Sequence, residues 1–81
     1  MPSAVVLINC EVGSETSVVD QVCAVEGVEK VYLVYGVFDI VALITSATMD
    51  GLEGALMRKI RTIPGVKRTM TLMISRSCLP S

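Results

Sequence analysis

The alternation of hydrophobic and polar positions along the chain predicts four strands and two helices. Short apolar runs rich in β-branched residues indicate strands at Ala4–Glu11, Val28–Tyr35, Val37–Thr45 and Val66–Ile74. Apolar residues recur at helical spacing from Ser14 to Val25 and again from Thr48 to Arg61. The predicted order is therefore strand, helix, two strands, helix, strand.

Residues at the ends of both helices support this assignment. Ser14 and Thr48 are residue types that favour the N-cap position. Gly27 is expected to follow the first helix in a left-handed conformation, and Pro64-Gly65 ends the second. The stripes expected to be buried are Val18, Val19, Val22, Cys23 and Val25 in the first helix and Met49, Leu52, Ala55, Leu56 and Ile60 in the second.

The two middle strands are separated by almost no polar sequence, so Gly36 and Val37 are expected to form the turn between them. A type I′ turn would force Val37 to a positive φ, which is unfavourable for a β-branched residue. A type II′ turn needs glycine only at its first central position. A two-residue hairpin of type II′ is therefore predicted.

Two segments resemble each other and indicate an internally duplicated domain. VEGVEKVYLV begins at Val25 and IPGVKRTMTLM begins at Ile63, so that Gly27 matches Gly65 at a separation of 38 residues. With right-handed crossovers, the order βαββαβ places both helices on one face of a four-stranded antiparallel sheet. The predicted fold is α+β, a ferredoxin-like plait. It forms one domain over residues 1–81, with a core at about 4–75 and a flexible tail at 76–81.

Both faces of the predicted sheet are apolar. The first strand carries Val6, Ile8 and Cys10 on one face and Val5, Leu7 and Asn9 on the other. A sheet that is covered by helices on one side only should be polar on its other side. The second face is therefore expected to pack against the sheet of another copy, which predicts a homodimer formed through the sheets.

Composition argues against several classes of protein. Apolar residues make up 52% of the chain, but no run approaches the roughly 18 residues of a membrane span. The N-terminus has neither a basic region nor a cleavage site of the signal-peptide type, which predicts a cytoplasmic protein. The formal net charge is −1, and the sequence offers no basic tract with which to bind nucleic acid.

Residue types that carry catalysis or bind metals are scarce. The chain has no histidine, which removes the commonest general base and metal ligand. The three cysteines form no CxxC motif; Cys10 and Cys23 are interpreted as buried apolar residues and Cys78 as exposed. No catalytic residue, metal or cofactor is predicted.

Asp39 is the acidic residue that is the strongest candidate for a ligand contact, because it follows the predicted turn on the face assigned to subunit contact. Two interpretations stay open. Its carboxylate either accepts backbone hydrogen bonds at the end of a hairpin or holds the ammonium group of a small zwitterion, whose carboxylate lies on N–H groups near Gly36. Thr69 and Thr71 point to one face of the last strand, either for their strand propensity or to orient a polar ligand.

Three motifs make the chain resemble a known family: GVFDI after a Val/Tyr-rich strand, TMDGLEGALMRKIRTIPGV, and RTMTLMI. Over residues 4–75 they resemble the C-terminal effector domain, or RAM domain, of the Lrp/AsnC (leucine-responsive, feast/famine) transcription regulators. The resemblance implies dimers joined through their sheets, rings of eight or ten chains, and amino acid effectors bound between dimers. The effector contacts that it implies are Tyr35, Gly36, Val37, Asp39, Thr69 and Thr71.

The helix-turn-helix of that family is absent from the sequence, so the chain looks like a stand-alone RAM domain without direct nucleic acid binding. The predicted function is amino acid sensing that modulates transcription or metabolism through a partner, such as a full-length Lrp/AsnC regulator. Two alternatives remain, a ferredoxin-like dimeric-barrel enzyme and an inert assembly scaffold. The lack of histidine weighs against the enzyme.

Overall fold

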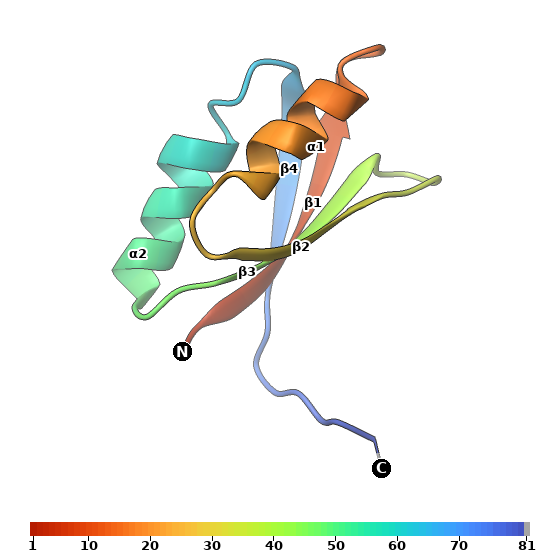
Figure 1. Ribbon diagram of the computed structural model, residues 1–81. Helices are drawn as coiled ribbons and strands as arrows, with labels where there is room; N and C mark the ends of the chain where they lie inside the picture. Colours follow the sequence, from red (N-terminus) through yellow and green to blue (C-terminus); the bar gives the residue numbers. More distant parts are fainter. Residues whose placement is uncertain (81) are drawn as a thin grey trace.

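Strands and helices follow one another in the predicted order in the computed structural model, which describes residues 1–80 (Figure 1). The elements are β1 (Ser3–Cys10), α1 (Glu15–Cys23), β2 (Val28–Leu33), β3 (Ile40–Thr45), α2 (Met49–Gly54), η1 (Ala55–Ile60) and β4 (Val66–Met73). Residues 74–80, which include most of the predicted tail, have no helix or strand, and Ser81 lies outside the described residues.

The four strands form one antiparallel sheet in the order β2-β3-β1-β4. The first strand in the sequence therefore lies in the interior of the sheet, and β2 and β4 are its edges. This order confirms the predicted ferredoxin-like α+β fold. In Figure 1, α1 connects β1 to β2, and the helix formed by α2 and η1 connects β3 to β4.

The core lies between the sheet and the helices. Every second residue of β1 and β3 is buried, and Val6 pairs with Ala42 near the centre of the sheet. These residues pack with Val18 and Val22 of α1 and with the buried stripe of the second helix. Because valine is a weak helix former, α1 is stabilised mainly by this burial, at about 1.5–3 kcal/mol for each fully buried side chain.

The two sequence repeats form the same turn at the entrance to the two edge strands. The N–H of Val28 donates to the carbonyl of Val25 at 3.2 Å, and the N–H of Val66 donates to the carbonyl of Ile63 at 3.1 Å. The third residue of each turn is a glycine with positive φ, 95° at Gly27 and 97° in the second repeat. This is the glycine position of a type II turn, so the duplication seen in the sequence is a duplication of structure.

Gly27 does not act as the residue directly after the first helix, because α1 already ends at Cys23. Cys23 itself is exposed, contrary to prediction, since the buried stripe of α1 is carried by Val18 and Val22. Neighbouring positions on a helix are turned by about 100° from each other, so Cys23 points away from that stripe. Cys10 is buried as predicted, and Cys78 is exposed.

The second helix is widened over its last turns. η1 is a π-helix, and the N–H of Arg61 donates to the carbonyl of Leu56 at 3.1 Å, five residues back. Leu52, Leu56 and Ile60 are buried as predicted, whereas Met49, which was expected in the same stripe, is 46% exposed at the first position of the helix.

Only one of the two predicted N-caps caps its helix with its side chain. The hydroxyl of Thr48 accepts a hydrogen bond from the N–H of Gly51 at 3.0 Å. The hydroxyl of Ser14 instead donates to the carbonyl of Glu11 at 2.6 Å, and its side chain makes no cap hydrogen bond.

The predicted two-residue hairpin is wrong. The last paired residues of the two strands are Leu33 and Ile40, and the N–H of Val34 donates to the carbonyl of Asp39 at 2.9 Å. Residues 34–39 therefore form a longer loop. Asp39 is held from both sides at this point, because its carbonyl accepts from Val34 after β2 and its N–H donates to the carbonyl of Ile8 in β1 at 2.9 Å.

The sheet face opposite the helices is apolar and partly exposed to solvent. Both faces of the sheet are therefore hydrophobic, as predicted. The central residues of the face opposite the helices are Val5, Leu7, Val41, Leu43, Met70 and Leu72, of which the first four are half-buried and the last two about half exposed. We call this surface the open face. An apolar surface of this kind is characteristic of a contact with another protein surface.

Candidate ligand site

The loop of residues 34–39 is fixed to the end of β1 by three hydrogen bonds. The carboxylate of Asp39 accepts one from the N–H of Cys10 at 2.8 Å, and the N–H of Asp39 donates one to Ile8. The side-chain amide of Asn9 donates the third, to the carbonyl of Val37 at 2.9 Å. The backbone contact expected of a hairpin-end carboxylate is thus present at Asp39, although it is made to a different strand.

Asn9 also connects the loop to the edge strand. Its side-chain oxygen accepts hydrogen bonds from Nε and Nη2 of Arg68, both at 3.4 Å. These are long hydrogen bonds and individually weak. Together with the bond to Val37, they place one amide between the loop and β4, so the positions of these two segments are coupled through a single side chain.

The environment of Asp39 also affects Cys10. Burial raises the pKa of the Cys10 thiol, and the negative charges of Asp39 and Glu15 raise it further. Cys10 therefore stays protonated at neutral pH and behaves as a packing residue rather than as a nucleophile.

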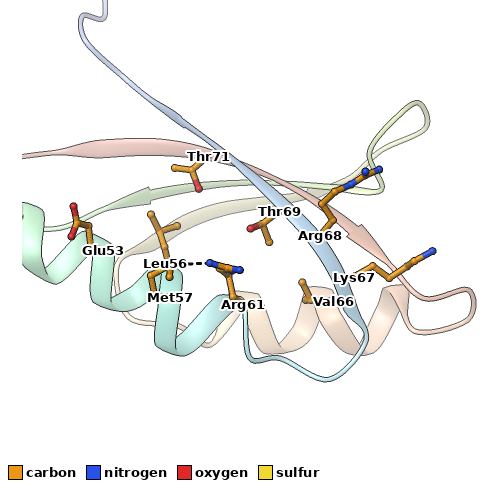
Figure 2. A pocket seen from close by; sticks show the side chains of 9 residues that line it. All are labelled: Glu53, Leu56, Met57, Arg61, Val66, Lys67, Arg68, Thr69 and Thr71. Carbon is orange, nitrogen blue, oxygen red and sulfur yellow. Dashed lines mark hydrogen bonds between the residues drawn. The ribbon is translucent and has the colours of Figure 1, made fainter.

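A groove runs between η1 and β4, and we call it the β4 groove (Figure 2). It has a volume of about 720 Å³. Its lining residues are Glu53, Leu56, Met57, Arg61, Val66, Lys67, Arg68, Thr69 and Thr71. Figure 2 shows Thr69 and Thr71 projecting from β4 toward the helix, whereas Arg68 projects away from it. The groove therefore has two hydroxyl groups on one wall and apolar side chains from the helix on the other.

The predicted site residues do not form one cluster in a single chain. Asp39 lines a smaller depression of about 400 Å³ with Asn9, Cys10, Lys67 and Arg68. Thr69 and Thr71 lie in the β4 groove, and Lys67 and Arg68 line both depressions.

The other three predicted site residues lie in the loop and line neither of these depressions. Tyr35 and Val37 are exposed, the first fully and the second to 82%, and Gly36 lies between them with a φ of 149°. Their side chains make no contribution to the core, which leaves them accessible to another molecule.

Sequence patterns did not reveal the helical wall of the groove. Leu56 was expected in the core, and it is buried while also lining the groove. Met57 and Arg61 lie within TMDGLEGALMRKIRTIPGV but were not expected to line a site, and only the position of the helix beside an edge strand identifies them. The alternation of Thr69 and Thr71 was the one available signal, and it placed both hydroxyls on the same face of β4.

The described residues contain no group of three or more His, Cys, Asp or Glu side chains placed to hold a metal ion. Over the same part of the chain, every helix is too short or too polar to cross a membrane. The chemistry that the site does offer is hydrogen bonding and charge, through hydroxyls, an amide, a carboxylate and exposed cations.

Comparison with known proteins gives consistent results. The sequence matches the family model of the Lrp/AsnC ligand binding domain over residues 3–81. A solved protein of Thermus thermophilus is similar with a TM-score of 0.91 and 29% identity, over 99% of this chain and 100% of that chain. No curated protein gave a significant match.

Two similar structures are about twice as long as this chain. A feast or famine regulatory protein from M. tuberculosis complexed with L-methionine has a TM-score of 0.78 and 28% identity, over 99% of this chain and 54% of its own. AsnC of E. coli has a TM-score of 0.90 at 20% identity, with the same shares of 99% and 54%, which indicates a common fold.

Proposed function

Because the chain belongs to the family of Lrp/AsnC ligand-binding domains, we propose that it senses an amino acid and passes the signal to a partner protein by binding, not by catalysis. The observation that carries the proposal is the β4 groove, which combines hydroxyls, opposite charges and apolar side chains within a volume large enough for an amino acid. The relative from M. tuberculosis, which is complexed with L-methionine, supports the same class of ligand.

The effector contacts remain those expected from the resemblance: Tyr35, Gly36, Val37, Asp39, Thr69 and Thr71. Since the loop and the groove are separate in one chain, we propose that the exposed loop of one chain completes the groove of a neighbouring chain. The exposure of Tyr35 and Val37 supports this arrangement, because a side chain without contacts in its own chain is free to cover a ligand held by another.

Assembly is part of the proposal. The open face supports a dimer formed through the sheets, because its apolar residues lose contact with water when a second sheet packs on them. Rings of such dimers, as in the resemblance, would bring the loop of one dimer close to another. The partner that receives the signal would be a full-length Lrp/AsnC regulator in the cytoplasm.

The test is a thermal unfolding experiment on the wild-type protein with each of the twenty amino acids. A ligand at ten times its Kd raises the free energy of unfolding by about 1.4 kcal/mol, which corresponds to several degrees in Tm for a domain of this size. Thr69→Val removes one groove hydroxyl and keeps the shape and strand propensity of the side chain, so it should weaken binding. Thr16→Val, on the exposed side of α1, is the matched control.

Native mass spectrometry with and without the effector would report assembly and ligand together. An oligomer that binds none of the twenty amino acids would favour the scaffold over the sensor. Binding that is unchanged in Thr69→Val would remove the groove from the proposed site.

A further inference from the structure

The charges around the β4 groove are arranged by sign. Glu53 is the acidic lining residue, and it belongs to α2, whereas Arg61 and Lys67 lie where the helix ends and β4 begins. Glu53 and Arg61 are eight positions apart, which is about 12 Å along a helix at 1.5 Å per residue. Figure 2 shows Glu53 at one end of the groove and Lys67 at the other, with Arg61, Thr69 and Thr71 between them.

Within residues 1–80, the cations of the groove have no strong acceptor of their own. Arg61 donates to the thioether of Met57 at 3.1 Å, and sulfur of this kind is a weak acceptor. Lys67 is exposed on β4, beside the irregularity at which the pairing with β1 shifts between Asn9 and Cys10. The guanidinium of Arg68 donates to Asn9 through Nε and Nη2, both at 3.4 Å, and projects away from the helix.

The distribution of charged residues along the whole chain also makes the surroundings of the groove positive. Of the seven Lys and Arg residues, all except Lys30 lie after residue 54, whereas all eight Asp and Glu residues lie at or before Glu53. The segment that forms η1 and β4 therefore contains cations and no carboxylate. With Arg61, Lys67 and Arg68 against Glu53, the lining residues carry a formal charge of +2, which a neutral zwitterion leaves uncompensated.

A ligand that matches this pattern has one ammonium group and two carboxylates. The ammonium group pairs with Glu53, one carboxylate is held by Arg61 and Lys67, and the hydroxyls of Thr69 and Thr71 donate to the other. Resting on the proposed function, we infer that the effector class of the β4 groove is a dicarboxylic amino acid, aspartate or glutamate. A neutral amino acid leaves the positive charge of the groove uncompensated and the two threonine hydroxyls without a charged acceptor, and a basic one adds a positive charge to a site that is already positive.

Pairs of nearly isosteric ligands test this inference. Thermal unfolding of the wild-type protein is measured with glutamate and glutamine, and with aspartate and asparagine, as potassium salts or with matched KCl. We expect the acidic member of one pair to raise Tm by roughly 5 °C or more at tenfold excess over its Kd, and its amide to have less than about a tenth of that affinity.

Variants locate the ligand. Arg61→Gln and Lys67→Gln should each weaken binding of the acidic ligand by roughly tenfold or more, since each removes a charged hydrogen bond. Lys30→Gln, an exposed cation on the opposite edge strand β2, should leave the affinity unchanged. All three side chains are exposed, and circular dichroism of each variant verifies that the fold is kept.

Each result separates the inference from the proposed function. If only neutral or basic amino acids bind, or if an amide binds as tightly as its acid, the protein is a sensor but its effector is not dicarboxylic. If the acidic ligand binds Arg61→Gln and Lys67→Gln as tightly as the wild-type protein, the ligand lies elsewhere and the proposed site in the β4 groove is wrong. If no amino acid binds at all, the proposed function falls together with the inference.

Discussion

The carboxylate of Asp39 accepts a hydrogen bond from the backbone N–H of Cys10 at 2.8 Å, and so joins the loop before β3 to the end of β1. These residues lie 29 positions apart in the chain, so the bond closes a long-range contact. It also gives Asp39 a structural role that is independent of any ligand.

Replacing Asp39 by alanine should therefore destabilise the protein even without effector. A hydrogen bond to a charged acceptor contributes about 1.5–3 kcal/mol, and the lower part of this range is expected because Asp39 is only partly buried. Urea unfolding measures the difference. An Asp39→Ala protein as stable as the wild type would show that the hydrogen bond contributes nothing.

Asp39→Asn keeps an oxygen acceptor and should cost less stability than alanine, so it is the cleaner variant for binding studies. Effector binding that is lost in a stable Asp39→Asn protein would assign Asp39 to the ligand as well as to the contact with Cys10.

Reaction of the three cysteines with a thiol reagent should occur in two phases. Cys23 and Cys78 are exposed and should react fast, whereas Cys10 is buried and its raised pKa lowers the fraction of thiolate. Labelling followed by mass spectrometry should find Cys10 at least about tenfold slower at about pH 8. Equal rates at all three sites would contradict the burial of Cys10.

The same thiol predicts a loss of stability at alkaline pH. In the unfolded chain a cysteine has a pKa of about 8.5, while the raised pKa of Cys10 keeps its thiol protonated to higher pH in the folded protein. Above about pH 8.5 the folded state thus binds more protons, and the free energy of unfolding falls with pH until the folded thiol also ionises. Cys10→Ala should flatten this part of the stability profile relative to the wild type.

Two glycines with positive φ should respond differently to alanine. At Gly13, with a φ of 88°, a new Cβ would meet no atom within 4 Å, so only the backbone conformation costs free energy, about 1–2 kcal/mol. At Gly27 the Cβ would also lie 2.5 Å from the carbonyl oxygen of Thr45, a backbone atom that cannot move aside as a flexible side chain could. Gly27→Ala should therefore be clearly the less stable variant in thermal unfolding. Similar Tm values would argue against the close approach at Gly27.

If the proposed sheet-to-sheet dimer forms, a lysine on the open face should dissociate it and leave the chain folded. Leu7 lies at the centre of this face, paired with Val41 on one side and Met70 on the other, and a charge buried there between two sheets would have no partner. The mass in solution of Leu7→Lys should fall, whereas Val12→Lys, at a site 99% exposed in a loop, should behave as the wild type. Leu7→Lys with the mass of the wild-type protein would place the subunit contact elsewhere.

Periodicity alone was sufficient for the fold, because β1 and β3 are buried on alternate residues and the second helix carries its apolar stripe at Leu52, Leu56 and Ile60. The same reasoning failed at the hairpin. The sequence between Leu33 and Ile40 is apolar enough to extend both strands, and nothing local reveals that Asp39 is also fixed to β1 through Ile8 and Cys10. Long-range hydrogen bonds of this kind have no signature in a short window of sequence.

The candidate site was predictable only in part, for a related reason. The alternation of Thr69 and Thr71 is a property of one strand and could be read directly. The remaining wall comes from the helix beside β4, and the choice of Met57 and Arg61 depends on how that helix is turned about its axis. That angle is set by packing against the sheet, and it cannot be predicted from the sequence of the helix alone.

The wide turn at the end of the second helix controls that angle. In an α-helix each residue advances the side chain by about 100°, so one residue fewer between Ala55 and Ile60 would swing Arg61 by that amount around the axis. Its guanidinium would then leave Met57 and point away from β4. The positive charge that a ligand meets in the groove thus depends on helical phase, and a single insertion or deletion at this turn would reduce it without any substitution among the lining residues.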